Sequence, residues 1–162
     1  MIQAWRIVHK RFAENAFSGE GPYLYGGRWN SPGHRVVYVS QSISLATLEV
    51  LVNGLKPEQI HDYIFFSIMI PVKQIQKIEK ESLPDDWNND PVPHSTQAVG
   101  DRWFAKRKSL ALQVPSAVVV QEYNFLLNPL HPEFAGLKIG PAEYYSFDHR
   151  LFFGFILLAA HV

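Results

Sequence analysis

The sequence predicts a single α+β domain, and three observations support that class. The chain has 162 residues, which suits one domain with a substantial core. Segments rich in β-branched and aromatic residues outnumber segments with helical periodicity, and irregular connections separate them. No internal repeat or low-complexity linker divides the chain, so we expect one mixed domain over residues 1–162.

Three strands are predicted in the first half of the chain. Residues 2–8 alternate apolar and polar side chains, and residues 35–40 are β-branched and aromatic. Residues 63–72 are almost wholly apolar, as in a buried strand. Between the first two strands, residues 18–33 (SGEGPYLYGGRWNSPG) are rich in glycine and proline, which predicts a long loop with sharp turns.

Two helices are predicted from capping residues and apolar spacing. Residues 42–53 form the first, with Ser42 as its N-cap and Gly54 at its end. Residues 95–109 form the second, with Ser95 as the cap and an apolar side.

The second half of the chain is less regular. Residues 83–94 (LPDDWNNDPVPH) are polar and turn-rich, which predicts a surface loop. Residues 110–121 are predicted as a strand that Pro115 interrupts at an edge or bulge. Residues 136–147 are expected to form the last strand.

Composition excludes several functional classes. Lys and Arg total 15 and Asp and Glu total 15, so the chain lacks the basic excess that nucleic acids or anionic membrane surfaces attract. There are no cysteines, which removes disulfides and thiolate chemistry and suits the cytoplasm, where we expect the protein. No histidine pair has the spacing of a helical metal site, and no phosphate-binding glycine motif occurs, so we expect no metal and no P-loop or Rossmann nucleotide site.

The first predicted helix carries one candidate catalytic carboxylate. At 100° per residue, Ser42, Glu49 and Asn53 share a narrow polar stripe, and apolar residues cover most of the remaining circumference. That stripe either faces bulk water, the commoner case, or places Glu49 at the edge of a cleft. A partly desolvated carboxylate in a cleft stabilises a developing cation strongly.

Two arginines are candidates for holding phosphate. Arg28 lies in GGRWNSPG, where glycines let a ligand approach the backbone and Trp29 could cover it; alternatively, this is an ordinary turn with a solvated arginine and a core tryptophan. Arg6 lies in an apolar strand and either emerges on the solvent side or points inward, where it needs an anion.

Polar residues near Pro115 offer weaker signals. Ser116 is not in a G-x-S-x-G nucleophile elbow, so a hydrolase nucleophile is not expected there. Asn124 and Asn128 are of a type that more often makes turns and caps than binds ligands.

Four features in order resemble the RES domain family, which is named for Arg, Glu and Ser. They are Arg6 in an early strand, then GGRWNSPG, VVYVSQSISLATLEVL and VPSAVVVQEYNFLLNPLHPEF. The resemblance covers about residues 5–152. Residues 153–162 form an apolar tail outside it, which could pack on the core, lie at a dimer or antitoxin interface, or come from an altered reading frame.

The resemblance implies both a fold and an activity. RES proteins are toxins of bacterial type II toxin–antitoxin pairs, usually encoded beside an Xre-type antitoxin, which would be this chain's partner. Their fold is similar to that of ADP-ribosyltransferases, with a split β-sheet and flanking helices. They deplete NAD+ by cleaving the nicotinamide–ribose bond. NAD+ would therefore be the substrate, with no metal or other cofactor.

The resemblance also implies the site residues. Glu49 matches the family glutamate and Ser116 the family serine, while Arg6 and Arg28 both fall at arginine positions. The expected catalytic residues are Glu49, Arg28 and Ser116. The expected NAD+-binding residues are Arg6, Arg28, Trp29, Tyr38 and Asn124.

Mechanistic alternatives remain open at this point. Ser116 could bind a ribose hydroxyl or the carboxamide, or orient Glu49, and Tyr38 could stack on nicotinamide. The acceptor could be water, phosphate or a protein side chain, the last making the chain a mono-ADP-ribosyltransferase. A non-catalytic nucleotide-binding or interaction module is a further alternative, and the sequence leaves open whether the chain is a homodimer.

Overall fold

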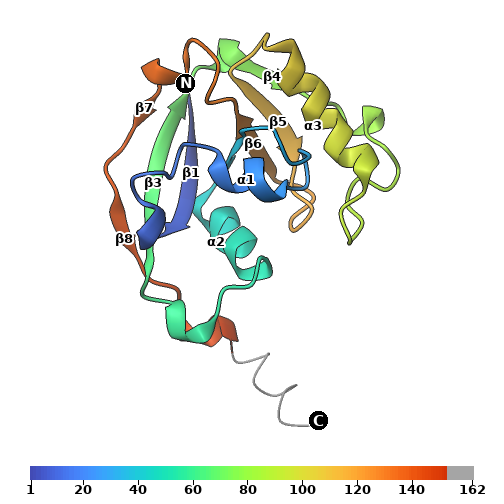
Figure 1. The fold of residues 1–162 in the computed structure, drawn as a ribbon. Helices are drawn as coiled ribbons and strands as arrows, with labels where there is room; N and C mark the ends of the chain where they lie inside the picture. Colours follow the sequence, from blue (N-terminus) through green and yellow to red (C-terminus); the bar gives the residue numbers. More distant parts are fainter. Residues whose placement is uncertain (153–162) are drawn as a thin grey trace.

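Eight strands form one sheet in the computed structural model, which describes residues 1–152 (Figure 1). Their order is β4-β5-β6-β2-β1-β3-β7, and β8 also pairs with β3. Neighbours are antiparallel except for β4 and β5. The strands are β1 (Ile2–His9), β2 (Val37–Ser40), β3 (Tyr63–Ile70), β4 (Ile75–Lys77), β5 (Ala111–Pro115), β6 (Tyr123–Leu127), β7 (Lys138–Ile139) and β8 (Glu143–Tyr145).

Three α-helices accompany the sheet. In Figure 1, α3 runs beside β4 and β5, and α2 lies below α1 near the centre of the view. The helices are α1 (Glu20–Tyr25), α2 (Ile43–Val52) and α3 (His94–Lys106). Short 3-10 turns complete the fold: Lys10–Phe12, Pro57–Gln59, Val72–Gln74, Lys80–Ser82, Phe134–Gly136 and His149–Phe152.

The pairing between β1 and β2 is the shortest strand pairing in the sheet. β1 pairs with β3 along its whole length, from Ile2 opposite Ile70 to His9 opposite Tyr63. Its pairing with β2 has a single register pair, Trp5 opposite Ser40. The sheet therefore consists of two halves that separate beyond this contact, and side chains can enter the gap between them.

Alternating residues of each strand fill three apolar clusters. Val37, Val39 and Phe125 pack in the first cluster, whereas the intervening Leu126 packs with Trp103 of α3 in the second. The third cluster includes Ala46 of α2 and lies at the other half of the sheet. The two larger helices are thus each anchored on one half, which leaves the gap between the halves to be lined by α2 and loops.

Most elements predicted from the sequence are confirmed. Strands occur within or close to 2–8, 35–40 and 63–72, and the helix predicted at 42–53 spans Ile43–Val52. The hydroxyl of Ser42 accepts the backbone N–H of Leu45 at 3.0 Å, as expected of an N-cap.

Four predictions need correction. The strand predicted over 110–121 ends at Pro115, and the chain turns and returns as β6, which was not predicted. The last strand is split into β7 and β8, with Pro141, which lacks an N–H, between them. The loop at 18–33 contains α1. The second helix begins at His94 and ends at Lys106, and Ser95 does not cap it: its hydroxyl donates to Asp86 instead.

Candidate active site

Glu49 lies on α2 and is held at one carboxylate oxygen. Its Oε1 accepts the hydroxyl of Ser116 at 2.9 Å and the side-chain amide of Asn124 at 2.6 Å. Within residues 1–152 no group donates a hydrogen bond to Oε2, and this oxygen keeps some solvent-accessible surface. The carboxylate is therefore fixed in orientation and keeps one oxygen accessible to a ligand.

Ser116 is fully buried directly after β5, and its hydroxyl makes one donated and two accepted hydrogen bonds. Its Oγ accepts the backbone N–H groups of Val118 (3.0 Å) and Val119 (3.1 Å), and its proton points at Glu49. Val118 and Val119, which carry these N–H groups, belong to the turn that follows the end of the strand at Pro115. Of the roles left open by the sequence, this geometry is that of a positioning residue for Glu49.

Asn124 lies at the same level on β6 and extends this network. Its Oδ1 accepts the hydroxyl of Ser40 at 2.7 Å, which leaves the amide nitrogen to donate to Glu49. Since Ser40 pairs with Trp5 at the junction of β1 and β2, the network connects the carboxylate to the point where the sheet splits. Asn128, by contrast, makes a turn by accepting the N–H of Leu130.

Arg6 points inward rather than to solvent. Its Nε donates to the Ala16 carbonyl at 2.6 Å and one terminal nitrogen donates to the Tyr38 carbonyl at 2.7 Å. Burial lowers the pKa of the guanidinium to about 10, so it remains charged at neutral pH. The two carbonyls accept from two of the nitrogens of the guanidinium, and Arg6 also lines the large cavity described below.

Arg28 is held by the loop predicted at 83–94. One terminal nitrogen donates to the carbonyls of Trp87 (3.0 Å) and Asn89 (2.9 Å). Its remaining N–H groups make no hydrogen bond to any residue in the described range 1–152. Arg28 is thus neither freely solvated nor fully satisfied, which suits an anion-binding side chain.

Trp29 belongs to the core. Its side chain is 2% exposed and stacks on Trp87 with ring centroids 5.9 Å apart. This agrees with the interpretation of Trp29 as a core residue and leaves its ring no free face with which to cover a phosphate. The stacked pair instead ties the loop carrying Arg28 to the loop that holds the Arg28 guanidinium.

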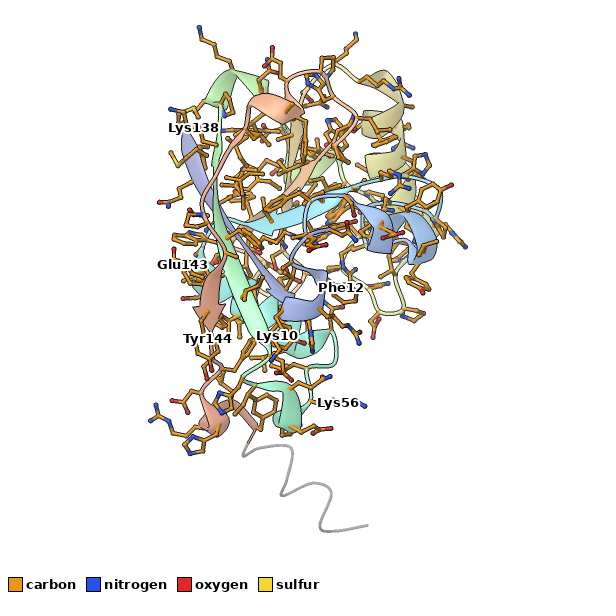
Figure 2. The ribbon with its side chains drawn as sticks, turned by 60° about the vertical axis from the view of Figure 1, so that its left-hand side comes forward. Lys10, Phe12, Lys56, Lys138, Glu143 and Tyr144 are labelled. Atoms are coloured by element: carbon orange, nitrogen blue, oxygen red, sulfur yellow. The ribbon has the colours of Figure 1, made fainter. Side chains whose placement is uncertain are left out.

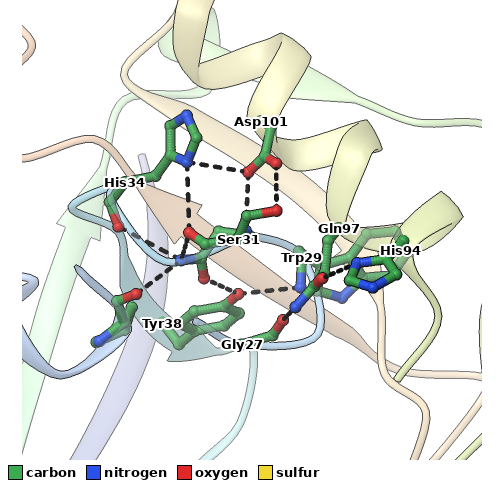
Figure 3. Close-up of polar contacts among 10 residues, drawn as sticks. Gly27, Trp29, Ser31, His34, Tyr38, His94, Gln97 and Asp101 are labelled. Atoms are coloured by element: carbon green, nitrogen blue, oxygen red, sulfur yellow. Dashed lines mark hydrogen bonds and ion pairs between the residues drawn. The ribbon is translucent and has the colours of Figure 1, made fainter. Parts of the chain in front are cut away.

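Tyr38 supports the loop of residues 26–33 from below (Figure 3). Its hydroxyl donates to Asn30 Oδ1 at 2.7 Å and accepts the backbone N–H of Trp29 at 3.1 Å. Burial raises the pKa of this phenol, so it stays neutral. Tyr38 therefore fixes the backbone next to Arg28.

Helix α3 holds the same loop from the other side (Figure 3). Gln97 donates to the Gly27 carbonyl at 3.1 Å, and Asp101 accepts both the N–H (2.9 Å) and the hydroxyl (2.7 Å) of Ser31. Between these residues, Gly100 lies against the Trp29 backbone so closely that an added Cβ would lie 1.7 Å from the Trp29 oxygen. The loop carrying Arg28 is thus rigidly seated.

Removal of the Tyr38 hydroxyl should loosen this support. In Tyr38→Phe the Trp29 N–H and the buried Asn30 oxygen lose their partner, so we expect a loss of about 2–4 kcal/mol in unfolding free energy. Because the folded state raises the Tyr38 pKa, the wild-type advantage is complete below the ordinary tyrosine value of about 10 and shrinks as pH rises above it. Urea unfolding at two pH values measures both effects; equal stability of the two proteins at neutral pH would contradict the assignment.

One large cavity of about 1030 Å³ brings the predicted residues together. Its volume is at the upper end of the range for ligand sites. Every predicted site residue lines it except Ser116, which lies behind Glu49. The predicted residues in its wall are Arg6, Arg28, Trp29, Tyr38, Glu49 and Asn124.

The donor set of the cavity suits an organic anion. Within residues 1–152, no three histidine or carboxylate side chains gather as metal ligands. Two guanidinium groups and one oriented carboxylate suit a phosphate-bearing molecule that develops positive charge near Glu49.

Residues 1–152 contain no helix with the length and apolar character needed to cross a bilayer.

Sequence reasoning missed several residues that build the site. Ser40 and Asn30 lie in segments that carry the family resemblance, but nothing in the sequence indicates which groups their side chains contact. Gln97 and Asp101 carry no signal of their own, although they lie four residues apart on one helix face.

Three relatives are similar to this chain over most of its length. "Toxin Res" of Photorhabdus laumondii subsp. laumondii is 44% identical over 131 residues, covering 80% of this chain and 83% of that protein. "Toxin Res" of Yersinia enterocolitica is 37% identical over 152 residues, covering 93% and 99%. The "Prs ADP-ribosylating toxin" of a Sphingobium species is 30% identical over 152 residues, covering 91% and 94%.

A solved structure and a family model agree with these relatives. The M. tuberculosis MbcT–MbcA toxin–antitoxin complex contains a chain that matches with a TM-score of 0.73 at 18% identity, covering 93% of this chain and 86% of that one. The match confirms the fold class predicted from the sequence. The model of the RES domain matches residues 3–148, nearly the whole described range. The chain therefore belongs to the RES domain family.

Proposed function

We propose that this RES-domain protein is a toxin that cleaves the nicotinamide–ribose bond of NAD+. One observation carries the proposal: Glu49 is fixed at one oxygen by Ser116 and Asn124 and keeps its other oxygen accessible in a cavity that also contains Arg6 and Arg28.

The chemistry of NAD+ fits such a site. Nicotinamide is cationic in NAD+ and leaves without protonation, so the bond breaks toward a ribosyl oxocarbenium ion. A negative charge near the anomeric carbon lowers the energy of that transition state more than that of the ground state. Glu49 supplies this charge. Glycosidases that must protonate their leaving group need a second carboxylate, and here one suffices.

Both arginines keep donors for the pyrophosphate. A guanidinium has five N–H groups, and the backbone carbonyls contacted by Arg6 and Arg28 use only some of them. Because these contacts fix each guanidinium before the substrate arrives, little side-chain entropy is lost on binding. Tyr38 contributes by holding the loop of Arg28, and it lines the same cavity.

Removal of the Arg28 side chain should weaken binding more than it slows chemistry. We expect Arg28→Ala to reduce NAD+ affinity at least about tenfold, because a charge-assisted contact to phosphate is lost. Calorimetry with NAD+ measures this. Arg102→Ala, which removes an exposed arginine of α3 outside the cavity, is the matched control. An affinity equal to that of the control would remove Arg28 from the pocket.

The product distribution tests the proposed reaction. Purified protein is incubated with NAD+ in buffers with and without inorganic phosphate, and the products are identified by mass spectrometry. We expect free nicotinamide in both; ADP-ribose indicates water as the acceptor, and a phosphorylated ADP-ribose indicates phosphate. Intact NAD+ after prolonged incubation, both with the purified protein alone and with cell extract added, would contradict the proposal and favour a non-catalytic nucleotide-binding module.

A second activity is favoured by one relative. The Sphingobium protein is named as an ADP-ribosylating toxin, and the same ribosyl cation can be trapped by a protein side chain. A transferase would leave a mass increase of one ADP-ribosyl group on a target protein. Nicotinamide release that appears only when cell extract is added would favour this alternative over hydrolysis or phosphorolysis.

An antitoxin is the expected partner. The solved toxin–antitoxin complex of similar fold supports this, and the family resemblance points to an Xre-type protein. Such a partner neutralises the toxin most simply by covering the cavity mouth. NAD+ cleavage should therefore cease on addition of the cognate antitoxin.

A further inference from the structure

The wall of the cavity also includes a second region. This region is formed by the end of β1, the turn after it and the segment after α2, rather than by the loops around Arg28. This second lobe is lined by His9, Arg11, Phe12, Gly54, Leu55, Gln59 and Tyr63. Glu49 lies on α2, and Asn53 caps the C-terminal end of that helix directly before Gly54 and Leu55 of the second lobe; both residues also line the cavity.

Aromatic and cationic side chains are preorganised in the second lobe. The Arg11 guanidinium lies 4.5 Å from the centroid of the Phe12 ring. His9 meets Phe12 edge-on at 6.4 Å and Tyr63 edge-on at 5.4 Å, and its Nδ1 accepts the backbone N–H of Arg11 at 3.2 Å. These contacts hold the group together without any ligand.

Phe12 nevertheless keeps much of its surface in solvent. Its side chain is 50% exposed although it lines the cavity. Figure 2 shows Phe12 on the turn that follows β1, close to Lys10. An exposed ring with a guanidinium on one face has its other face available for a flat, apolar group.

The charge on Arg11 is also available. Neighbouring Lys10 pairs with Asp62 at 2.8 Å, whereas no carboxylate within residues 1–152 pairs with Arg11. A flat base followed by a phosphate would satisfy both side chains, with the base on Phe12 and the phosphate oxygens on Arg11.

We propose that the second lobe binds the adenosine monophosphate half of the dinucleotide, with the base stacked on Phe12 and its phosphate held by Arg11. The inference rests on the proposed function, because it places NAD+ on both sides of Glu49: the nicotinamide riboside lies toward Tyr38 with its phosphate on Arg28 or Arg6, and the adenosine lies toward Phe12 with its phosphate on Arg11. The second lobe then determines preference for a dinucleotide over a mononucleotide.

Two substrates separate this role from catalysis. Nicotinamide mononucleotide contains the same scissile bond but lacks the adenosine half. We expect Phe12→Ala to raise KM for NAD+ at least about fivefold, with kcat unchanged, because stacking of a base on an aromatic ring is lost. Turnover of the mononucleotide should not change. Phe12→Trp, which keeps a ring, should restore the wild-type KM.

The matched control removes another exposed ring elsewhere. Tyr144 on β8 is 65% exposed and does not line the cavity, and Figure 2 places it away from Phe12. Tyr144→Ala should leave both substrates unaffected. Since half of the Phe12 surface is solvent-exposed, Phe12→Ala should keep the wild-type circular dichroism spectrum.

Binding of adenosine monophosphate, measured by calorimetry, tests the lobe independently of turnover. We expect it to bind the wild type and to bind Phe12→Ala and Arg11→Gln at least about fivefold more weakly. Failure of the wild type to cleave NAD+ would overturn the proposed function but leave this measurement valid. No binding to the wild type, or equal affinities for all proteins, would overturn the second lobe as an adenosine site.

Discussion

Glu49→Gln should abolish NAD+ cleavage while the protein stays folded. Glutamine has nearly the same shape, and its amide oxygen can still accept from Ser116 and Asn124, so the local network survives. The negative charge beside the ribose is lost, however. Removal of one well-placed electrostatic group costs about 10²–10³ in rate, and we expect at least that loss in kcat. Nicotinamide release over time measures it.

A matched variant controls for the loss of charge alone. Glu143 lies on β8, is exposed and does not line the cavity, so Glu143→Gln should keep wild-type turnover. Both variants should show wild-type thermal unfolding, and Glu49→Gln should still bind NAD+. Near wild-type turnover by Glu49→Gln would show that the carboxylate does not stabilise the transition state, and the mechanism would be wrong.

In the proposed mechanism, the contact of Glu49 with Ser116 would let one carboxylate act alone. The two donors on Oε1 orient the carboxylate and leave Oε2 toward the ligand, so no reorganisation is needed as charge develops on the sugar. Ser116 acts through Glu49 in this arrangement, because its own lone pairs are occupied by backbone N–H groups.

Gly100→Ala should destabilise the fold severely. Alanine is the better helix former, so on propensity alone the change would stabilise α3. The added Cβ would, however, lie 1.7 Å from the Trp29 carbonyl oxygen, which is backbone and cannot rotate away. We expect the unfolding free energy to fall by about 3 kcal/mol or more, since overpacking against backbone forces α3 and the loop apart.

Displacement of this loop should also weaken substrate binding, because Arg28 directly precedes Trp29. Gly21 in α1 provides the control: a Cβ there meets nothing within 4 Å, so Gly21→Ala should leave stability unchanged or slightly raised. Thermal and urea unfolding of the two variants should therefore differ widely. Similar transitions would mean that α3 does not press on the loop as described.

The part of the site on α2 was predictable from local sequence. Capping by Ser42 and the apolar pattern define the helix, and the same periodicity isolates Glu49 on a polar stripe. Periodicity could not decide between water and a cleft for that stripe, since this depends on contacts with β5 and β6, which come much later in the chain. The partners of Glu49 are 67 and 75 residues away in sequence.

The remaining errors also have nonlocal causes. Residues 110–121 are largely apolar, so nothing in composition marks the turn after Pro115; the turn depends on Ser116 accepting two N–H groups. Arg6 follows the alternation of an ordinary strand, and its inward position is made possible by the narrow pairing of β1 with β2. From the sequence, Gly100 is only a residue of low helix propensity; its role in packing depends on the Trp29 backbone, which lies beside it in the structure.

The crystal structure of Glu49→Gln with bound NAD+ tests the central claim most directly. The variant should hold uncleaved substrate, with the anomeric carbon of the nicotinamide riboside against the substituted side chain on α2 and the pyrophosphate within hydrogen-bond distance of Arg28 or Arg6. NAD+ bound elsewhere, or bound in this cavity with the ribose remote from that side chain, would contradict the account.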